Sequence, residues 1–156
     1  MGIAMKKILI LSALILSFPS LSQDWLEDGE VRESVSVIDG KGYGFAQHYV
    51  SKKLCNEEII LGLITSIEPE LLNINGTNVN VEYVGKSGLG VPFYGAKSSK
   101  GRDYLLQQFL KKNEVVVNNL DTNGRSNVFS AVGFSKARSI NIKKCKDKNK
   151  LKKNAL

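Results

Sequence analysis

Apolar and polar residues alternate most regularly between residues 77 and 84, where Val79, Val81 and Tyr83 follow one another at every second position. This period of two is typical of a strand with one buried face. The apolar run 71–74 precedes this segment, and Asn75-Gly76 lies between the two. An Asn-Gly pair favours the left-handed conformations of a tight hairpin turn. The sequence therefore predicts a β-hairpin over residues 71–84.

Other segments also have the composition of strands. Val35 and Val37 alternate with serines within residues 31–38, and residues 59–67 form a mostly apolar run that ends at a Glu-Pro step. Residues 45–54 fit both the strand period and the helix period, so their conformation stays open. Two shorter candidate strands lie later in the chain, at residues 115–117 and 128–134.

One helix is expected after a loop rich in glycine and proline over residues 86–97. Ser98 or Ser99 can cap its first turn, and Asn113 can end it in a left-handed conformation. An apolar stripe runs along it, formed by Tyr104, Leu105 and Phe109. The predicted fold class is α+β: a small, mainly antiparallel twisted sheet, open or barrel-like, with one principal amphipathic helix.

The N-terminal segment 1–22 has the order of a secretory signal peptide. Lys6 and Lys7 precede an apolar run over residues 8–18, and small residues follow Pro19. The apolar run would span roughly 16 Å as a helix, about half the hydrocarbon thickness of a bilayer. We therefore expect cleavage before Gln23, which leaves no stable membrane anchor, and a periplasmic or secreted protein. The alternative is that residues 1–22 are retained as a membrane anchor.

Export changes how the two cysteines, Cys55 and Cys145, are interpreted. In an oxidising compartment, two cysteines far apart in sequence predict a structural disulfide. Two free buried thiols or a metal pair are the alternatives. His48 is the only histidine and the chain has no CxxC or HxxxH spacing, so the sequence gives no reason to expect a metal site or a cofactor.

The formal net charge of +7 is unevenly distributed. Residues 23–142 contain 13 basic and 14 acidic side chains, and they are expected to form a single domain. Residues 143–156 contain seven lysines and one aspartate. We expect this segment to be a lysine-rich tail, mostly disordered beyond Cys145, that provides solubility or weak binding to polyanions.

Catalytic motifs are weak throughout the chain. Gly85-Lys86-Ser87 is similar to the end of a phosphate-binding loop, but Asn80 occupies the position of the required first glycine. No GxSxG elbow accompanies His48, so packing is the preferred interpretation of that histidine. Glu68 and Glu70 bracket Pro69, a spacing that suits either acid–base carboxylates or two exposed turn residues.

Four short segments are similar in order to segments of staphylococcal nuclease-like domains: residues 37–40, 67–70, 101–109 and 121–125. The resemblance implies an OB barrel with helices that cleaves phosphodiesters with calcium. Asp39 and Glu70 would lie near the acidic sites of that family, and Arg125 would be its second phosphate-stabilising arginine. The expected arginine is absent from residues 59–67, which implies a weak or inactive enzyme.

The glycine-rich loop also carries basic and aromatic residues of the kind that bind nucleic acid: Lys86, Tyr94, Lys97, Lys100 and Arg102. A surface loop with scattered charges is the alternative. The expected function is that of an exported, non-catalytic binding or accessory protein, such as an inhibitor or immunity-type partner of another protein. The alternative is a degenerate nuclease-like phosphodiesterase or a nucleic-acid-binding OB-type domain.

Overall fold

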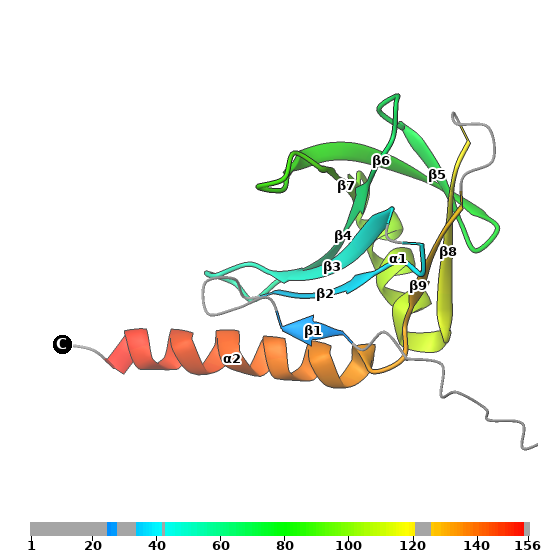
Figure 1. The fold of residues 1–156 in the computed structure, drawn as a ribbon. Coiled ribbons are helices and arrows are strands. Elements are labelled where there is room, and N and C mark those ends of the chain that lie inside the picture. Colours follow the sequence, from blue (N-terminus) through cyan, green and yellow to red (C-terminus); the bar gives the residue numbers. More distant parts are fainter. Residues whose placement is uncertain (1–24, 28–33, 42, 121–125, 155–156) are drawn as a thin grey trace, which may run out of the picture.

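The computed structural model describes residues 25–27, 34–41, 43–120 and 126–154, so the predicted signal peptide lies outside the described residues. The described chain forms nine strands and two helices (Figure 1). In chain order they are β1 (Leu26–Glu27), β2 (Ser34–Ile38), β3 (Gly44–Val50), β4 (Glu57–Leu63), β5 (Leu71–Ile74), β6 (Thr77–Lys86), β7 (Pro92–Ala96), α1 (Ser99–Lys111), β8 (Glu114–Asn119), β9 (Ser126–Ser130) and α2 (Phe134–Asn154).

The sheet has the strand order β1-β2-β3-β4-β7-β6-β5-β8-β9, and every pairing is antiparallel. Strands β2 to β9 curl into a nearly closed barrel, because β9 comes back to the turn between β2 and β3. At that seam the Gly40 N–H donates a hydrogen bond to the Val128 carbonyl at 3.3 Å. The predicted antiparallel, barrel-like sheet is confirmed.

The predicted hairpin is confirmed as β5–β6. Ile74 pairs with Thr77, and the turn residues Asn75 and Gly76 have φ angles of 47° and 88°. Both angles lie in the left-handed region that an Asn-Gly turn requires. The side-chain oxygen Oδ1 of Asn75 also accepts a hydrogen bond from the Val116 N–H, and this bond joins the turn to β8.

Several strands differ in their bounds from the sequence prediction: the candidate over residues 128–134 ends at Ser130 in β9, and the run 59–67 is strand only to Leu63 in β4. In the segment 45–54, which the sequence left open, residues up to Val50 belong to β3 and the rest form a turn. Strand β7 lies inside the segment that was expected to be a loop, and it pairs with both β4 and β6. Pairing on both sides supplies the backbone hydrogen bonds that the local composition does not indicate.

Helix α1 is confirmed, with Ser98 as its N-cap. The Ser98 hydroxyl oxygen accepts a hydrogen bond from the Gly101 N–H at 3.0 Å. The helix ends one residue earlier than expected, since Lys112 is already extended with φ −111°. The predicted left-handed end at Asn113 is therefore wrong.

The core lies inside the barrel and beneath α1, and three aromatic rings close it at the α2 end. Trp25 packs on Phe109 of α1 and on Phe134 of α2, with ring centroids 5.3 and 4.7 Å apart. The Trp25 indole N–H donates a hydrogen bond to the Ser130 carbonyl at 3.0 Å. This cluster joins the N-terminal segment, α1 and the start of α2.

A second helix replaces the predicted disordered tail. Strand β9 ends at Ser130, and Phe134 begins α2, which continues through the lysine-rich segment to Asn154. The expectations of one principal helix and of disorder beyond Cys145 are therefore wrong. The predicted boundary between domain and tail, at residue 142, lies inside this helix. Its buried side carries few apolar residues, so its sequence gives almost no helical hydrophobic period.

Candidate functional site

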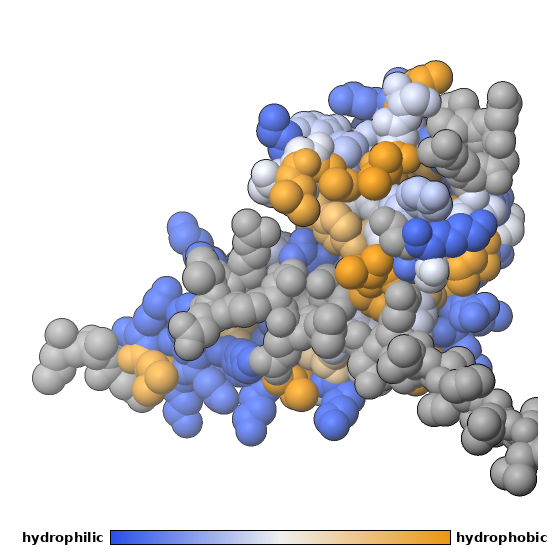
Figure 2. Space-filling view, in the orientation of Figure 1, coloured by the Kyte–Doolittle hydropathy of each residue, from blue (hydrophilic) through white to orange (hydrophobic). Residues whose placement is uncertain are grey.

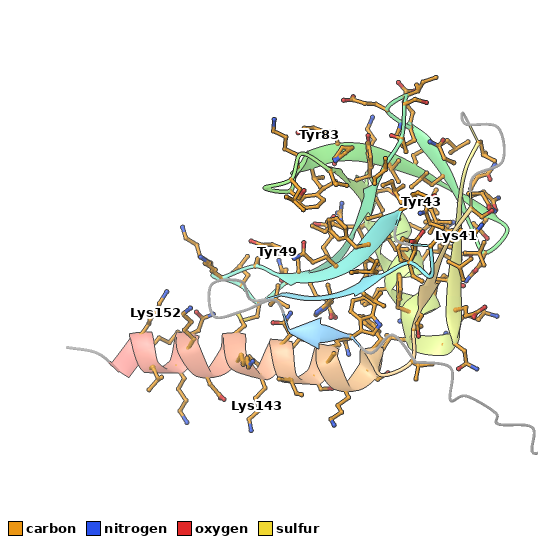
Figure 3. The ribbon with its side chains drawn as sticks, viewed as in Figure 1. Lys41, Tyr43, Tyr49, Tyr83, Lys143 and Lys152 are labelled. Atoms are coloured by element: carbon orange, nitrogen blue, oxygen red, sulfur yellow. A yellow bond between two sulfur atoms is a disulfide. The ribbon has the colours of Figure 1, made fainter. Side chains whose placement is uncertain are left out.

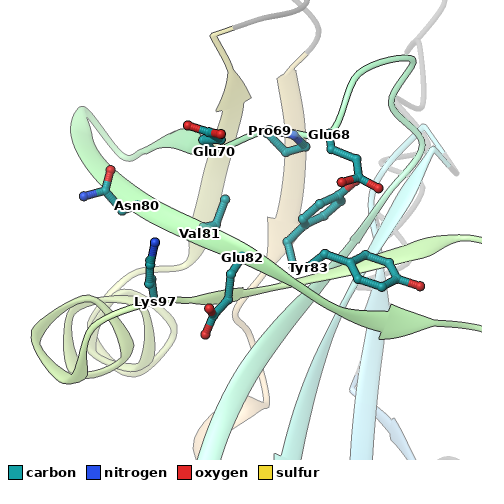
Figure 4. A pocket seen from close by; sticks show the side chains of 9 residues that line it. Glu68, Pro69, Glu70, Asn80, Val81, Glu82, Tyr83 and Lys97 are labelled. Carbon is teal, nitrogen blue, oxygen red and sulfur yellow. The ribbon is translucent and has the colours of Figure 1, made fainter.

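Acidic side chains surround a hollow of about 590 Å³ near the β5–β6 side of the barrel (Figure 4). We call it the acidic hollow. The segment before β5, the middle of β6 and the β7–α1 connection line it, with the residues Glu68, Pro69, Glu70, Asn80, Val81, Glu82, Tyr83, Tyr94 and Lys97. Such concave surfaces with a few polar groups are where ligands usually bind.

Backbone hydrogen bonds fix the walls of the acidic hollow. The Val81 N–H donates to the Glu70 carbonyl at 2.9 Å, and the Lys97 N–H donates to the Asn80 carbonyl at 3.0 Å. These bonds hold the Glu-Pro-Glu segment and the end of β7 on either side of β6. Pro69 is buried between two exposed glutamates, Glu68 and Glu70. Of the two interpretations that the sequence left open for Glu68 and Glu70, the exposed position is the one found in the structure.

Tyr94 forms part of the wall of the acidic hollow and is 1% exposed. Its hydroxyl has no hydrogen-bond partner among the described residues. A buried polar group without a partner costs about 1 to 3 kcal/mol. The Tyr94 ring packs edge-on against Tyr83, with centroids 6.4 Å apart, and Tyr83 is 49% exposed. The Tyr83 ring is therefore accessible to solvent, and the Tyr94 hydroxyl makes no hydrogen bond within the described chain.

The charge of the acidic hollow is negative. Its lining contains three exposed carboxylates, those of Glu68, Glu70 and Glu82, and one ammonium group, that of Lys97. In Figure 4 the Glu70 and Glu82 side chains lie on opposite sides of β6. Glu82 also acts on Glu58 of β4: burial raises the pKa of the Glu58 carboxyl, nearby Arg102 opposes the rise, and Glu82 adds to it. In the part of the chain that the structure describes, no three His, Cys, Asp or Glu side chains are arranged to hold a metal ion.

The predicted basic loop is divided by the structure. Tyr94 and Lys97 line the acidic hollow, whereas Lys86 and Lys100 are exposed outside its lining. The Arg102 guanidinium donates to the Ala96 and Lys97 carbonyls at 3.2 and 3.3 Å, so it supports the β7–α1 connection. Because the Tyr94 ring is buried, it cannot serve as an open stacking platform for a base.

Two of the three nuclease-like residues, Asp39 and Glu70, lie in the described part of the chain. Asp39 is buried: its Oδ1 accepts hydrogen bonds from the Lys41 and Tyr43 N–H groups, and its Oδ2 accepts one from the Asn127 amide at 2.6 Å. Glu70 lines the acidic hollow, and Asp39 does not. Arg125 lies outside the described residues, so the nuclease-like arrangement stays a prediction.

The single histidine belongs to a buried network between the sheet and α2. His48 Nε2 lies 3.0 Å from Glu57 Oε2, and the Arg138 guanidinium donates to both Glu57 oxygens at 2.6 and 2.5 Å. The Asn141 amide nitrogen lies 3.2 Å from His48 Nδ1. Since an amide NH₂ only donates, Nδ1 accepts and the ring proton sits on Nε2.

This network keeps His48 neutral and Glu57 ionised. Burial lowers the pKa of His48, although the hydrogen bond with Glu57 opposes that change. Burial by itself would raise the pKa of Glu57, but hydrogen bonds from Arg138 and His48 outweigh it and lower that pKa. Both ring nitrogens of His48 are engaged within the protein, so the histidine is placed to hold α2 on the sheet.

The predicted disulfide between Cys55 and Cys145 is confirmed, with Cα atoms 5.9 Å apart. It joins the β3–β4 connection to the middle of α2. Beside it, the Asn149 amide donates a hydrogen bond to the Lys53 carbonyl at 3.2 Å. A structural disulfide fits an oxidising compartment outside the cytoplasm. Neither described helix combines the length and the apolar character that a membrane crossing requires.

Apolar side chains gather on a second surface, on the outer side of β3, β4 and β7 (Figure 2). Phe45 and Phe93 pack edge to face there, 5.2 Å apart, and the Phe45 ring lies where a Cβ on Gly62 would be. Near it, Ile38 and Ile64 are more than half exposed. Exposed apolar groups of this kind are common at sites of protein–protein contact.

Comparison with known proteins identifies no relative: no protein-family model, no curated protein and no solved structure matches this chain. Sequence reasoning had singled out Glu68, Glu70, Tyr94 and Lys97, but it had not brought them together. It missed Glu82 and Tyr83, whose only sequence signal is their place in an alternating strand.

Proposed function

We propose that the protein is an exported, non-catalytic binding protein that accepts a basic group of another envelope protein in the acidic hollow. The observation that carries this proposal is the buried Tyr94 hydroxyl, which lacks a partner in the described chain at the wall of a hollow with three carboxylates. Natural proteins satisfy nearly all buried polar groups. A ligand in the acidic hollow that displaced the side chains covering this hydroxyl would supply the missing hydrogen bond.

The chemistry of the lining favours a lysine or arginine side chain as the bound group. Glu68, Glu70 and Glu82 attract a cation, and the exposed ring of Tyr83 offers a face for a cation–π contact. An ammonium or guanidinium group only donates hydrogen bonds, so it would use the Tyr94 oxygen as an acceptor. The apolar outer face of β3, β4 and β7 gives a binding partner further contact area.

A non-catalytic role agrees with how the reactive side chains are used. His48 has both ring nitrogens bonded within the fold, and the Asp39 carboxylate accepts three hydrogen bonds from its own chain. Neither group is free to act as a general base. The role that fits best is that of a partner, of inhibitor or immunity type, for another protein of the envelope.

Photo-crosslinking in the cells that produce the protein tests this proposal. A photoreactive benzophenone amino acid is placed at Tyr83 in the acidic hollow or, as a control, at exposed Asp103 on α1. We expect a discrete protein adduct from position 83 that is absent from position 103. The adduct should disappear when E70Q and E82Q are added. An adduct that persists in that variant, or none at position 83, would refute the proposal.

A further inference from the structure

Helix α2 carries a row of lysines along one side, which we call the lysine stripe. Spacings of three, four and seven residues place these side chains on one face of a helix. That face is opposite the buried residues Phe134, Asn141 and Cys145. The lysine stripe consists of Lys136, Lys143, Lys146, Lys150 and Lys153.

All five ammonium groups are available to a partner. Each lysine of the stripe is exposed, and none has a hydrogen bond or ion pair within the described chain. In Figure 3 the side chain of Lys143 points away from the body of the protein. Figure 2 shows hydrophilic side chains along the length of α2. Asp147 is the only acidic residue in the same helix.

The fold holds this row of charges rigidly. The Arg138–Glu57 ion pair, the Cys55–Cys145 disulfide and the Asn149–Lys53 hydrogen bond fasten α2 at three points between residues 138 and 149. At 1.5 Å per residue, the lysine stripe extends over about 25 Å. Figure 1 shows α2 continuing beyond the edge of the sheet as a straight rod. A flat anionic surface can therefore meet these lysines without having to order the helix backbone first.

We propose that the lysine stripe docks the protein onto the surface of a bilayer that contains anionic phospholipids. Charge complementarity selects this occupant, because each lysine near such a surface strengthens binding by about fivefold at low salt. Nucleic acid is disfavoured because the stripe has no aromatic side chain on which a base could stack. The disulfide, moreover, fits a compartment outside the cytoplasm, where the protein can meet a membrane surface.

Docking through α2 would also orient the acidic hollow. In Figure 1, α2 lies on one side of the molecule, and β5 and β6, which border the hollow, lie on the other. An anionic bilayer attracts the lysine stripe and repels the carboxylates of the hollow. The hollow would then face away from the membrane.

Vesicle sedimentation with the disulfide-bonded chain from residue 23 onward tests the proposal. The probes are vesicles of phosphatidylcholine alone and of phosphatidylcholine with phosphatidylglycerol in equal parts. We expect binding only to the anionic vesicles, in 50 mM salt, and its loss in 300 mM salt. The variant K143Q/K146Q/K150Q/K153Q should bind at least 50-fold more weakly. D147N should bind more tightly, by about fivefold.

A matched variant separates the stripe from net charge alone. K86Q/K100Q/K111Q/K112Q removes four exposed lysines elsewhere and should bind anionic vesicles within threefold of the unmodified protein. Circular dichroism and thermal melting establish that each variant is folded, and D147N tests the stripe without removing any lysine. Equal losses in both lysine variants, equal binding to neutral vesicles, or tighter binding to a 20-nucleotide single strand than to anionic vesicles would overturn the proposal.

Discussion

At the scale of single residues, the hydroxyls of Tyr94 and Tyr104 differ in their hydrogen bonding. The Tyr94 hydroxyl is buried without a partner in the described chain, whereas the Tyr104 hydroxyl donates a hydrogen bond to the Ile74 carbonyl at 2.9 Å. Removing a hydroxyl has opposite consequences in these two situations. Two Tyr→Phe substitutions therefore form a matched pair.

Tyr94→Phe is expected to raise the free energy of unfolding by about 1 kcal/mol, because it removes an unsatisfied buried group. Tyr104→Phe should lower it by about the same amount, since it removes the hydrogen bond to the Ile74 carbonyl. Urea denaturation monitored by fluorescence measures both. A loss of stability in Tyr94→Phe comparable to that in Tyr104→Phe would mean that the Tyr94 hydroxyl already has a structural role.

His48 makes the stability of the protein depend on pH below neutrality. Its pKa is lowered by burial, so the unfolded chain binds a proton below about pH 6.5 that the folded chain binds less readily. The free energy of unfolding is therefore largest above pH 6.5 and falls on acidification, by at most about 1.4 kcal/mol per pH unit. Glu57, whose pKa is also lowered, adds a further loss only below about pH 4.5.

Urea midpoints between pH 7.5 and pH 5 measure this dependence without the contribution of Glu57. His48→Gln provides the control, because the amide can still donate to Glu57 but does not titrate, and no other histidine is present. Glu58, whose pKa is raised, acts in the opposite sense in both proteins, so the two slopes are compared with each other. The unmodified protein should lose more stability on acidification than the variant, and equal slopes in the two proteins would contradict the neutral, buried histidine.

Several of these residues were recognisable in the sequence. The cap at Ser98, the cysteine pair and the packing of His48 all follow from local residue types or from counting. Tyr94 was expected in an exposed loop and is buried instead. Its burial depends on β7 pairing with β4 as well as with the preceding strand β6, and β4 lies about 30 residues earlier in the chain, where the neighbourhood of Tyr94 does not reveal it.

At the scale of elements, the predictable parts are those with strong local signals. The β5–β6 hairpin is set by Asn75-Gly76, and α1 by its serine cap and apolar stripe. Helix α2 was missed because polar contacts and a disulfide hold it, through Arg138, Asn141 and Cys145, and not a continuous apolar face. Hydrophobic periodicity does not detect such a helix.

The disulfide is expected to be the strongest single clamp on α2. Its cysteines are 90 residues apart in sequence, and reducing a link across a loop of that size costs about 2 to 5 kcal/mol. Urea denaturation with and without reductant measures the loss. The control is Cys55→Ala/Cys145→Ala, whose stability should match the reduced protein and not respond to reductant. Identical midpoints for the oxidised and reduced protein would contradict this role.

At the scale of the whole molecule, the barrel and the separation of charge explain the two proposed surfaces together. Closure of β9 onto the β2–β3 turn, through Gly40 and Asp39, was not predictable because it joins segments about 88 residues apart. The concentration of lysines after residue 142 is visible in the sequence, but their arrangement along one side of a helix is not. A disordered tail was expected where the fold presents a rigid basic helix on the side away from the acidic hollow.

The central claim is that the acidic hollow binds a basic group. The most direct measurement is an NMR titration of the ¹⁵N-labelled protein with N-acetyl-lysine methylamide, with the norleucine analogue as the uncharged control. We predict saturable shifts in the millimolar range, centred on Asn80, Glu82 and Lys97, that E70Q/E82Q weakens about fivefold and D103N/E114Q leaves unchanged. Equal shifts with the norleucine analogue, or shifts centred on α2, would contradict the claim.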